Sequence, residues 1–209
     1  MNAIVQPDRI GKYMHTAAGS KFWPLDPRPL EVEIETLAHH LATRCRYNGA
    51  IQHPAHKERI FYSVAEHSVL ASYLGPEEEA LERLLHDGSE AYNGDLIRPL
   101  KYDPLFRAPF KKVEDANEHA IARRFGLQFP YPPSVKAADE ALAAAEVNQV
   151  VPKRAGEDWE SGKLHDDSVV APVTIECWLP YEAKQRFLAR FYELWTPERQ
   201  ARAMNPGNP

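Results

Sequence analysis

Two helical patterns joined by a short turn constrain the fold of this chain more than any other feature. Apolar residues recur at helical spacing on both sides of Gly75-Pro76. A turn of this length makes the two predicted helices antiparallel neighbours. The first carries His67 on its apolar side, and the second carries the adjacent pair His86 and Asp87 within an apolar run. Burying such side chains is costly unless something satisfies them, so the pattern predicts a polar site inside a helical core.

The rest of the chain repeats the helical pattern and predicts an all-α fold. The β-branched run at 168–179 is interrupted by Pro172 and is a weak strand signal. We therefore expect a single helical-bundle domain over 1–209, with its core at about 31–195. The helices are expected at about 34–44, 64–74, 77–92, 110–125, 134–150 and 182–195.

Three segments are expected to lie outside these helices. The first thirty residues should form an irregular arm, because three prolines near its end exclude a helix. Phe22 and Trp23 are expected to dock this arm onto the core. A loop-rich insert is expected near 151–180, and residues 197–209 are expected to form a disordered tail.

Composition and charge limit the possible partners. The 209 residues include 25 Lys and Arg against 30 Asp and Glu, a net charge of −5. This balance disfavours a nucleic-acid polymer but permits a small anionic substrate. No apolar stretch suggests a secretory signal or a membrane span. Cys45 and Cys177 lie in no metal-binding spacing, so we expect reduced thiols in a cytoplasmic protein.

The residues at the predicted polar site have the chemistry of metal ligands. His67 and His86 lie at similar distances from the turn between their helices, so they can meet at one ion. Asp139 adds a carboxylate from a separate predicted helix with small alanine neighbours. Nitrogen and oxygen donors without a thiolate disfavour a structural zinc site. We expect one divalent ion (Co, Mn, Zn, Mg or Fe, with a transition metal favoured) bound by His67, His86, Asp87 and Asp139.

Two further carboxylates are candidates for catalysis. Glu90 shares a helical face with His86 and Asp87. Asp95 follows a predicted break in the helix and can point back towards the same site. A bound metal ion lowers the pKa of a coordinated water. Glu90 is therefore the candidate acid/base residue that orients this water and serves the leaving group.

Each of these residues also has an ordinary interpretation. Considered by itself, His67 is typical of a core histidine whose hydrogen bonds are made. Considered by themselves, Glu90 is typical of a solvent-exposed helix residue and Asp95 of a turn residue. Five polar residues at inward positions are harder to explain in this way. A second pair, His165-Asp166, lies in a polar loop without apolar neighbours and is expected to be plain surface.

Three stretches of the sequence resemble a known superfamily. "SVAEHSVLAS", "LLHDGSEAYNGDLIRPLK" and "VKAADEAL" are similar to the HD-domain metal-dependent phosphohydrolases. Within them, the nearest resemblance is to the YfbR-like 5′-deoxynucleotidases and the phage dATP triphosphohydrolases. The signature H…HD…D is present with its "HDxxE" and "GDxxxPxK" continuations, and the resemblance covers about residues 35–150. It implies an all-helical bundle that often assembles into homo-oligomers.

The resemblance also implies roles for individual residues. Glu90 would be the catalytic acid/base partner, and Asp95 would assist the attacking water. Tyr47 departs from the pattern, because relatives have a tryptophan there that packs on the nucleoside. The segment between the substrate arginine and the first metal ligand is also longer here, with the insert "QHPAHKERIF". The residues expected to bind substrate are Arg46, Tyr47, Lys101 and Lys136.

These patterns predict an enzyme that acts on a small deoxynucleotide. The first expectation is a 5′-deoxynucleotidase that releases phosphate from a dNMP. One alternative is a dNTP triphosphohydrolase, for which Lys101, Lys136, Arg46 and Arg98 can supply the additional cations. An alternative of another class is a non-catalytic nucleotide-binding regulator. The expected partners are a nucleotide and further copies of the chain, with no nucleic-acid polymer and no membrane.

Overall fold

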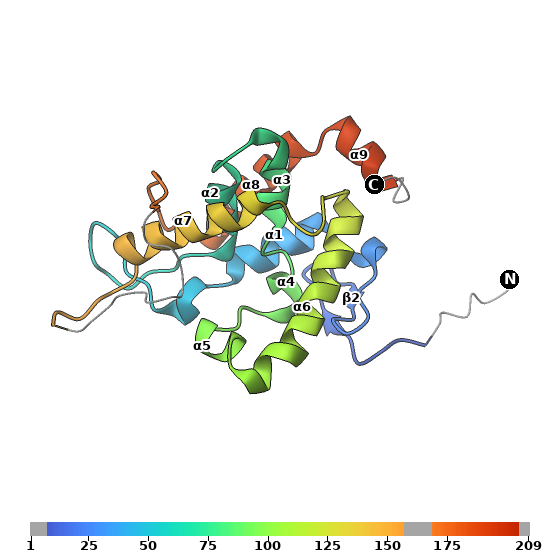
Figure 1. The fold of residues 1–209 in the computed structure, drawn as a ribbon, viewed down its shortest axis with the longest axis horizontal. Helices are drawn as coiled ribbons and strands as arrows, with labels where there is room; N and C mark the ends of the chain where they lie inside the picture. Colours follow the sequence, from blue (N-terminus) through green and yellow to red (C-terminus); the bar gives the residue numbers. More distant parts are fainter. Residues whose placement is uncertain (1–7, 157–168, 205–209) are drawn as a thin grey trace, which may run out of the picture.

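The computed structural model describes residues 8–156 and 169–204, and within these ranges the protein is almost entirely helical (Figure 1). This confirms the predicted all-α class. One antiparallel pair of two-residue strands is present, β1 (Met14–His15) and β2 (Lys21–Phe22). Short 3-10 helices are η1 (Pro29–Glu31), η2 (Arg46–Gly49) and η3 (Glu77–Glu79). The α-helices are α1 (Ile34–Thr43), α2 (Val64–Ser72), α3 (Ala80–Leu85), α4 (Glu90–Asn93), α5 (Arg98–Lys101), α6 (Pro104–Phe125), α7 (Pro133–Gln149), α8 (Pro180–Leu194) and α9 (Pro197–Met204).

The core lies where α1, α2, α3 and α8 pack together, and α7 lies across α2 and α3 (Figure 1). Leu37, Leu84 and Phe187 are fully buried in one apolar cluster at this junction. Burial of a side chain of this size contributes about 1.5–3 kcal/mol. This cluster also contains residues of α2, and a second cluster with Ala71, Leu142 and Ala145 joins α2 to α7. The two clusters hold α2, α3 and α7, which position the polar site.

The start of α2 follows the sequence prediction in part. Ser63 is the N-cap, and its hydroxyl accepts a hydrogen bond from the Glu66 N–H at 3.0 Å. The Glu66 carboxylate does not bond back to this cap. Instead it accepts the backbone N–H groups of Glu176, Cys177 and Trp178 at 2.9, 3.0 and 2.7 Å. Glu66 thus ties α2 to the chain segment that precedes α8.

The helix predicted over 77–92 is interrupted, and the interruption falls on the His-Asp pair. After α3, residues 86–89 form turns, and α4 begins at Glu90. The Gly88 N–H bonds to the Leu85 carbonyl at 2.9 Å, which is the tighter i to i+3 pattern. A Cβ on Gly88 would lie 3.1 Å from Ile121 Cδ1, so α6 packs close to the chain at this point. His86 and Ser89 keep helical φ and ψ, so the interruption is a tightening of the hydrogen-bond pattern and not a change of direction.

Helix α6 begins earlier than the predicted start near residue 110. The Asp103 carboxylate caps it by accepting the Leu105 N–H at 2.9 Å, and Pro104 occupies the first turn, where its missing N–H costs nothing. Pro109 lies inside this helix. The prediction placed the start beyond this proline, and the capping residues before it are the signal that the prediction overlooked.

The N-terminal arm docks as expected but is not irregular throughout. Phe22 is fully buried, and its ring stacks on Tyr92 with the centroids 3.6 Å apart. Trp23 is half-buried, with Arg9 over its ring. The strand pair β1–β2, which places Met14 opposite Phe22, was not expected. It forms because the intervening turn brings Phe22 back over the core.

The prediction of a disordered tail is wrong for residues 197–204, which form α9. Arg199 is buried, and its guanidinium bonds to the Glu82 carboxylate at 2.9 Å and to the Glu78 carbonyl. A Cβ on Gly126 would lie 2.8 Å from the Ala203 backbone nitrogen, so α9 packs tightly on the end of α6. The segment looked polar in the sequence because its anchoring side chain is an arginine.

The predicted loop-rich insert is described only in part. Residues 151–156 and 169–179 contain neither helix nor strand, in agreement with the expectation. The pair His165-Asp166 lies outside the described residues. Within the described parts of the chain, every helix is too short or too polar to cross a membrane.

Candidate metal site

Four predicted ligands from three parts of the chain meet at one place. His67 comes from α2, His86 and Asp87 from the turns after α3, and Asp139 from α7. His67 Nε2 lies 3.4 Å from His86 Nε2 and 3.3 Å from Asp139 Oδ1. Asp87 reaches both rings, with Oδ2 3.5 Å from His67 Nε2 and Oδ1 3.3 Å from His86 Nε2. The antiparallel packing expected from the Gly75-Pro76 turn therefore brings the two histidines together.

The partners of the Nδ1 atoms define the tautomers of both histidines. His67 Nδ1 lies 2.6 Å from the Glu146 carboxylate, and His86 Nδ1 lies 2.7 Å from the Arg83 carbonyl. Both partners can only accept, so each Nδ1 carries the proton. When no second proton is bound, each ring presents an Nε2 lone pair, and the two Nε2 atoms lie 3.4 Å apart.

Lone pairs that converge in this way need a cation between them. His67, His86 and Asp87 each offer a ligand atom, and these atoms lie within 4.8 Å of one another, so the cluster can hold a metal ion. Asp139 lies beside it, with Oδ1 3.9 Å from His86 Nε2. Its role as a fourth ligand stays a prediction. Two imidazoles and carboxylate oxygens suit a borderline divalent transition ion.

The electrostatics of the cluster fit this interpretation. Burial and the Arg46 charge lower the pKa of His67, but the carboxylates of Glu146 and Asp139 outweigh them and raise it to about 9. Burial alone would raise the pKa of the Asp139 carboxyl. The hydrogen bond and the charge of His67 have the larger effect and hold that pKa well below the usual range. A proton on Nε2 and a metal ion are therefore alternative ways to satisfy the same acceptors.

The two predicted catalytic carboxylates lie close to the cluster. Glu90 opens α4, and its Oε2 is buried without a hydrogen-bond partner among the described residues. Burial and the charges of Asp87 and Asp95 raise the pKa of Glu90 well above its usual value. Burial also raises the pKa of Asp95, which follows Gly94 at a positive φ of 81°. The charge of Asp87 raises the pKa of both carboxyls, so both lie within electrostatic reach of the cluster, and the catalytic roles of Glu90 and Asp95 stay predictions.

Arg46 and Tyr47 reach the site from η2. Arg46 Nη1 lies 3.5 Å from Asp87 Oδ2, and Nη2 lies 3.0 Å from Glu146 Oε2. The Tyr47 hydroxyl donates to the same Glu146 oxygen at 2.8 Å. Tyr47 has a positive φ of 52°, which turns the chain so that both side chains face inward. Substrate contacts by these two residues remain predictions.

The two predicted phosphate-binding lysines differ in position. Lys101 Nζ pairs with Glu114 Oε1 at 2.7 Å. Burial lowers its pKa, but Glu114, Asp87 and Glu90 outweigh burial and raise it, so Lys101 lies at the edge of the site. The Lys136 side chain is 81% exposed and pairs with Glu140 on its own helix at 3.5 Å. Lys101 thus lies within electrostatic reach of the cluster and pairs with Glu114, whereas Lys136 lies in solvent.

The sequence prediction missed Glu146, which is fully buried on α7. Its carboxylate accepts from Arg46, Tyr47, Tyr62 and His67. Burial raises its pKa, but the charges of Arg46 and His67 outweigh this and hold the pKa at about 2. A signal was present, since Glu146 follows Asp139 by two helical turns and interrupts an apolar run of alanines.

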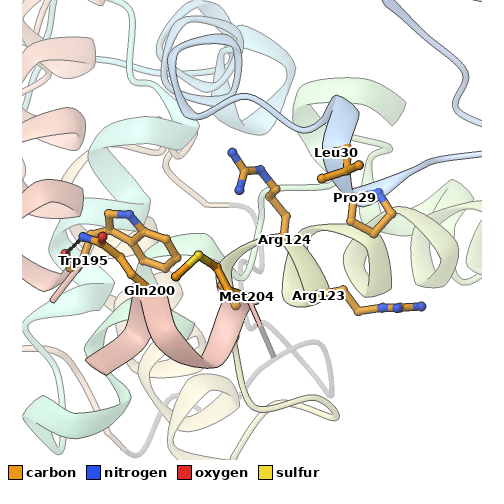
Figure 2. A pocket seen from close by; sticks show the side chains of 8 residues that line it. Pro29, Leu30, Arg123, Arg124, Trp195, Gln200 and Met204 are labelled. Atoms are coloured by element: carbon orange, nitrogen blue, oxygen red, sulfur yellow. Dashed lines mark hydrogen bonds between the residues drawn. The ribbon is translucent and has the colours of Figure 1, made fainter. Parts of the chain in front are cut away.

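A separate groove of about 800 Å³ lies away from this cluster (Figure 2). It is bounded by Pro29 of η1, Arg124 of α6, Trp195 at the end of α8 and Met204 of α9, and it shares no residue with the cluster. Its surface is mainly apolar, and it contains no group that could act on a substrate in the way the His-Asp cluster can. We therefore place the candidate chemistry at the cluster.

Fold and site together define an all-helical protein with a candidate divalent-metal site made of two histidines and an aspartate. The chain is 34% identical to the uncharacterized protein RCAP_rcc00048 of Rhodobacter capsulatus over 189 residues, which is 85% of this chain and 92% of that protein. It is also 34% identical to the uncharacterized protein YfdR of Escherichia coli K12 over 134 residues, 64% of this chain and 70% of that protein. The chain belongs to the family of these two proteins.

A shorter similarity points to an activity. The chain is 40% identical to the 5′-deoxynucleotidase VP0926 of Vibrio parahaemolyticus over 57 residues, which is 27% of this chain and 29% of that protein. No family model matches the sequence. The similarity to a 5′-deoxynucleotidase therefore covers about a quarter of the chain.

Proposed function

We propose that this protein is a metal-dependent phosphohydrolase of the HD superfamily that removes the 5′-phosphate from a deoxynucleoside monophosphate. The observation that carries the proposal is the convergence of two histidine Nε2 lone pairs with carboxylates of Asp87 and Asp139. The similarity to a 5′-deoxynucleotidase supports the choice of reaction. His67, His86, Asp87 and Asp139 would hold the ion.

When bound, the ion would polarise a phosphoryl oxygen and acidify a water. The residues of the chain supply the remaining chemistry. Arg46 offers its guanidinium to the phosphate. Asp95 accepts a proton from the attacking water, whose oxygen forms the new P–O bond. Glu90, held neutral by its raised pKa, donates a proton to O5′ as the old P–O bond breaks. The products are orthophosphate and a deoxynucleoside.

The charge at the site favours a monophosphate over a triphosphate. Lys101 is already paired with Glu114, and Lys136 is exposed and paired with Glu140. Arg46 is shared between Glu146 and Asp87. The cations expected to neutralise a tripolyphosphate are therefore largely compensated by carboxylates of the protein.

Product analysis with a matched panel of dNMP, NMP and dNTP tests the proposal. The purified protein is loaded with Mn²⁺, Co²⁺ or Mg²⁺, and the products are separated by ion chromatography. We expect orthophosphate from at least one dNMP and none from the Asp87→Asn variant. Intact tripolyphosphate from a dNTP would replace the proposal with the triphosphohydrolase. Tight nucleotide binding with no turnover under any metal would replace it with the non-catalytic regulator.

A further inference from the structure

The buried carboxylate of Glu146 contacts one candidate metal ligand, His67, and the candidate phosphate-binding residue Arg46. We propose that Glu146 is a positioning residue, which fixes the metal-binding tautomer of His67 and holds Arg46 beside the metal site. The inference rests on the metal site of the proposed function. It assigns a role to a residue that the motif-based prediction does not include.

One oxygen of the carboxylate serves the metal side. Glu146 Oε1 lies 2.6 Å from His67 Nδ1 and 2.7 Å from the Tyr62 hydroxyl, and all three residues are buried. A carboxylate bonded to the outer nitrogen of a metal-binding histidine fixes the ring and raises the basicity of the ligand. His67 can then present Nε2 towards His86 and Asp87 without a proton on it.

The other oxygen serves the substrate side. Glu146 Oε2 accepts from Arg46 Nε at 3.3 Å, from Arg46 Nη2 at 3.0 Å and from the Tyr47 hydroxyl at 2.8 Å. This leaves Arg46 Nη1 to point at Asp87 Oδ2, 3.5 Å away. The guanidinium is therefore clamped along one edge, and its other edge faces the candidate ligands.

A glutamine at this position cannot perform both tasks. All the neighbours of Glu146 donate to it, and a carboxylate accepts through both oxygens. An amide accepts through one oxygen and donates from its nitrogen. In a Glu146→Gln variant, the NH2 group must therefore face either the His67 and Tyr62 donors or the Arg46 and Tyr47 donors. The substitution keeps the size of the side chain and removes the dual function.

Metal affinity is the direct measurement. Co²⁺ dissociation constants are determined by chelator competition for the full chain as wild type, Glu146→Gln and Tyr62→Phe. Loss of an outer partner of a metal-binding histidine typically weakens metal binding by about 10- to 100-fold, and we expect that loss for Glu146→Gln. Tyr62→Phe removes a bond to the same oxygen but leaves the His67 contact, so its affinity should stay near that of the wild type. The amide can spare only one of the two sides, so Glu146→Gln with wild-type affinity for both Co²⁺ and a dNMP overturns the inference. An equal loss of Co²⁺ affinity in Tyr62→Phe also overturns it.

A measurement on the wild type keeps the test decisive if Glu146→Gln does not fold. Long-range proton–nitrogen NMR spectra of the Zn²⁺-loaded protein report which histidine nitrogen carries the proton. We expect His67 to bind Zn²⁺ through Nε2 with a proton on Nδ1. Coordination through Nδ1, or absence of Zn²⁺ binding, overturns the inference. Absence of nucleotide hydrolysis by the metal-loaded wild type would refute the proposed enzyme but leave the affinity comparison unaffected.

Discussion

The orientation of two imidazole rings sets the chemistry of the candidate site at the scale of single residues. His86 donates from Nδ1 to the Arg83 carbonyl, and His67 donates from Nδ1 to Glu146. Neither partner is a ligand, yet together they direct both Nε2 atoms at Asp87. Because a proton on His67 competes with the metal, metal binding should weaken as the pH falls below the His67 pKa of about 9.

Asp87→Asn should remove the metal. The amide keeps the shape of the side chain, but it cannot offer an anionic oxygen to an ion held by His67 and His86. The loss of affinity should exceed the roughly 10- to 100-fold that removal of an outer partner costs. Elemental analysis after dialysis measures it, with Asp115→Asn as the control because Asp115 pairs with Lys111 on the surface of α6. Equal metal contents in wild type and Asp87→Asn would end the assignment.

Glu90→Gln should separate catalysis from metal binding. Glu90 lies near Asp87 without being needed as a ligand, so the variant should retain its metal. Its kcat should fall by about 100-fold or more, the scale for loss of a general acid/base. Since the protonated form donates, wild-type activity should also decline as the pH rises past the raised pKa of Glu90. A near-normal kcat in metal-loaded Glu90→Gln would contradict the role.

At the scale of elements, α2 is fixed from several directions. Glu66 accepts three backbone N–H groups from residues 176–178, and the buried Arg190 of α8 donates to the Ser72 hydroxyl at 3.2 Å. Glu146 of α7 holds His67 between these two points. The helix that carries the first candidate ligand therefore depends on contacts with α7, α8 and the segment before α8.

Glu66 should make stability depend on pH. Burial raises its pKa from 4.5 to about 7, although the three N–H bonds oppose the shift. A carboxyl with a raised folded-state pKa stabilises the fold below about pH 4.5, and this stabilisation is lost as the pH rises through 7. The full effect is about 3 kcal/mol.

Urea unfolding with a chelator, at pH 5 and pH 8, measures this effect in the wild type and in Glu66→Gln. The wild type should lose free energy of unfolding between these pH values, and the variant should lose less of it. Parallel pH dependence in the two proteins would show that Glu66 does not titrate in this range.

At the scale of the whole molecule, the sequence predicted what depends on local pattern. The order of helices and the meeting of His67 with His86 followed from helical periodicity and one short turn. Glu146 was missed because its partners lie up to 100 residues away in sequence. The helix α9 was missed because an arginine in a polar segment is expected on the surface, and the sequence does not show that Arg199 pairs with the buried Glu82.

Exposed apolar side chains at one end of the molecule support the expected homo-oligomer. Leu105 is 82% exposed, and Tyr102 and Phe106 lie beside it in sequence with 55% and 48% exposure. They occupy the α5–α6 corner, at the lower edge of the view in Figure 1. Adjacent exposed apolar residues are typical of protein interfaces. We expect light scattering to give at least twice the monomer mass.

The double variant Leu105→Lys and Phe106→Lys should shift this equilibrium towards the monomer without lowering the thermal unfolding midpoint of the monomer. An exposed tyrosine of α8, changed as Tyr192→Lys, is the control. A monomeric wild type would refute the oligomer, and an unchanged mass in the double variant would place the interface elsewhere.

The three hydrogen bonds that Glu66 accepts from residues 176–178 have a consequence for when the site can assemble during synthesis. All four candidate ligands have been synthesised once the ribosome passes Asp139, but the backbone groups that satisfy Glu66 emerge only with residues 176–178. Until then, the carboxylate next to His67 lacks its partners, and α2 lacks α8. We therefore expect a nascent chain stalled between these points to contain every candidate ligand without assembling the site, which would make metal binding a late step of synthesis.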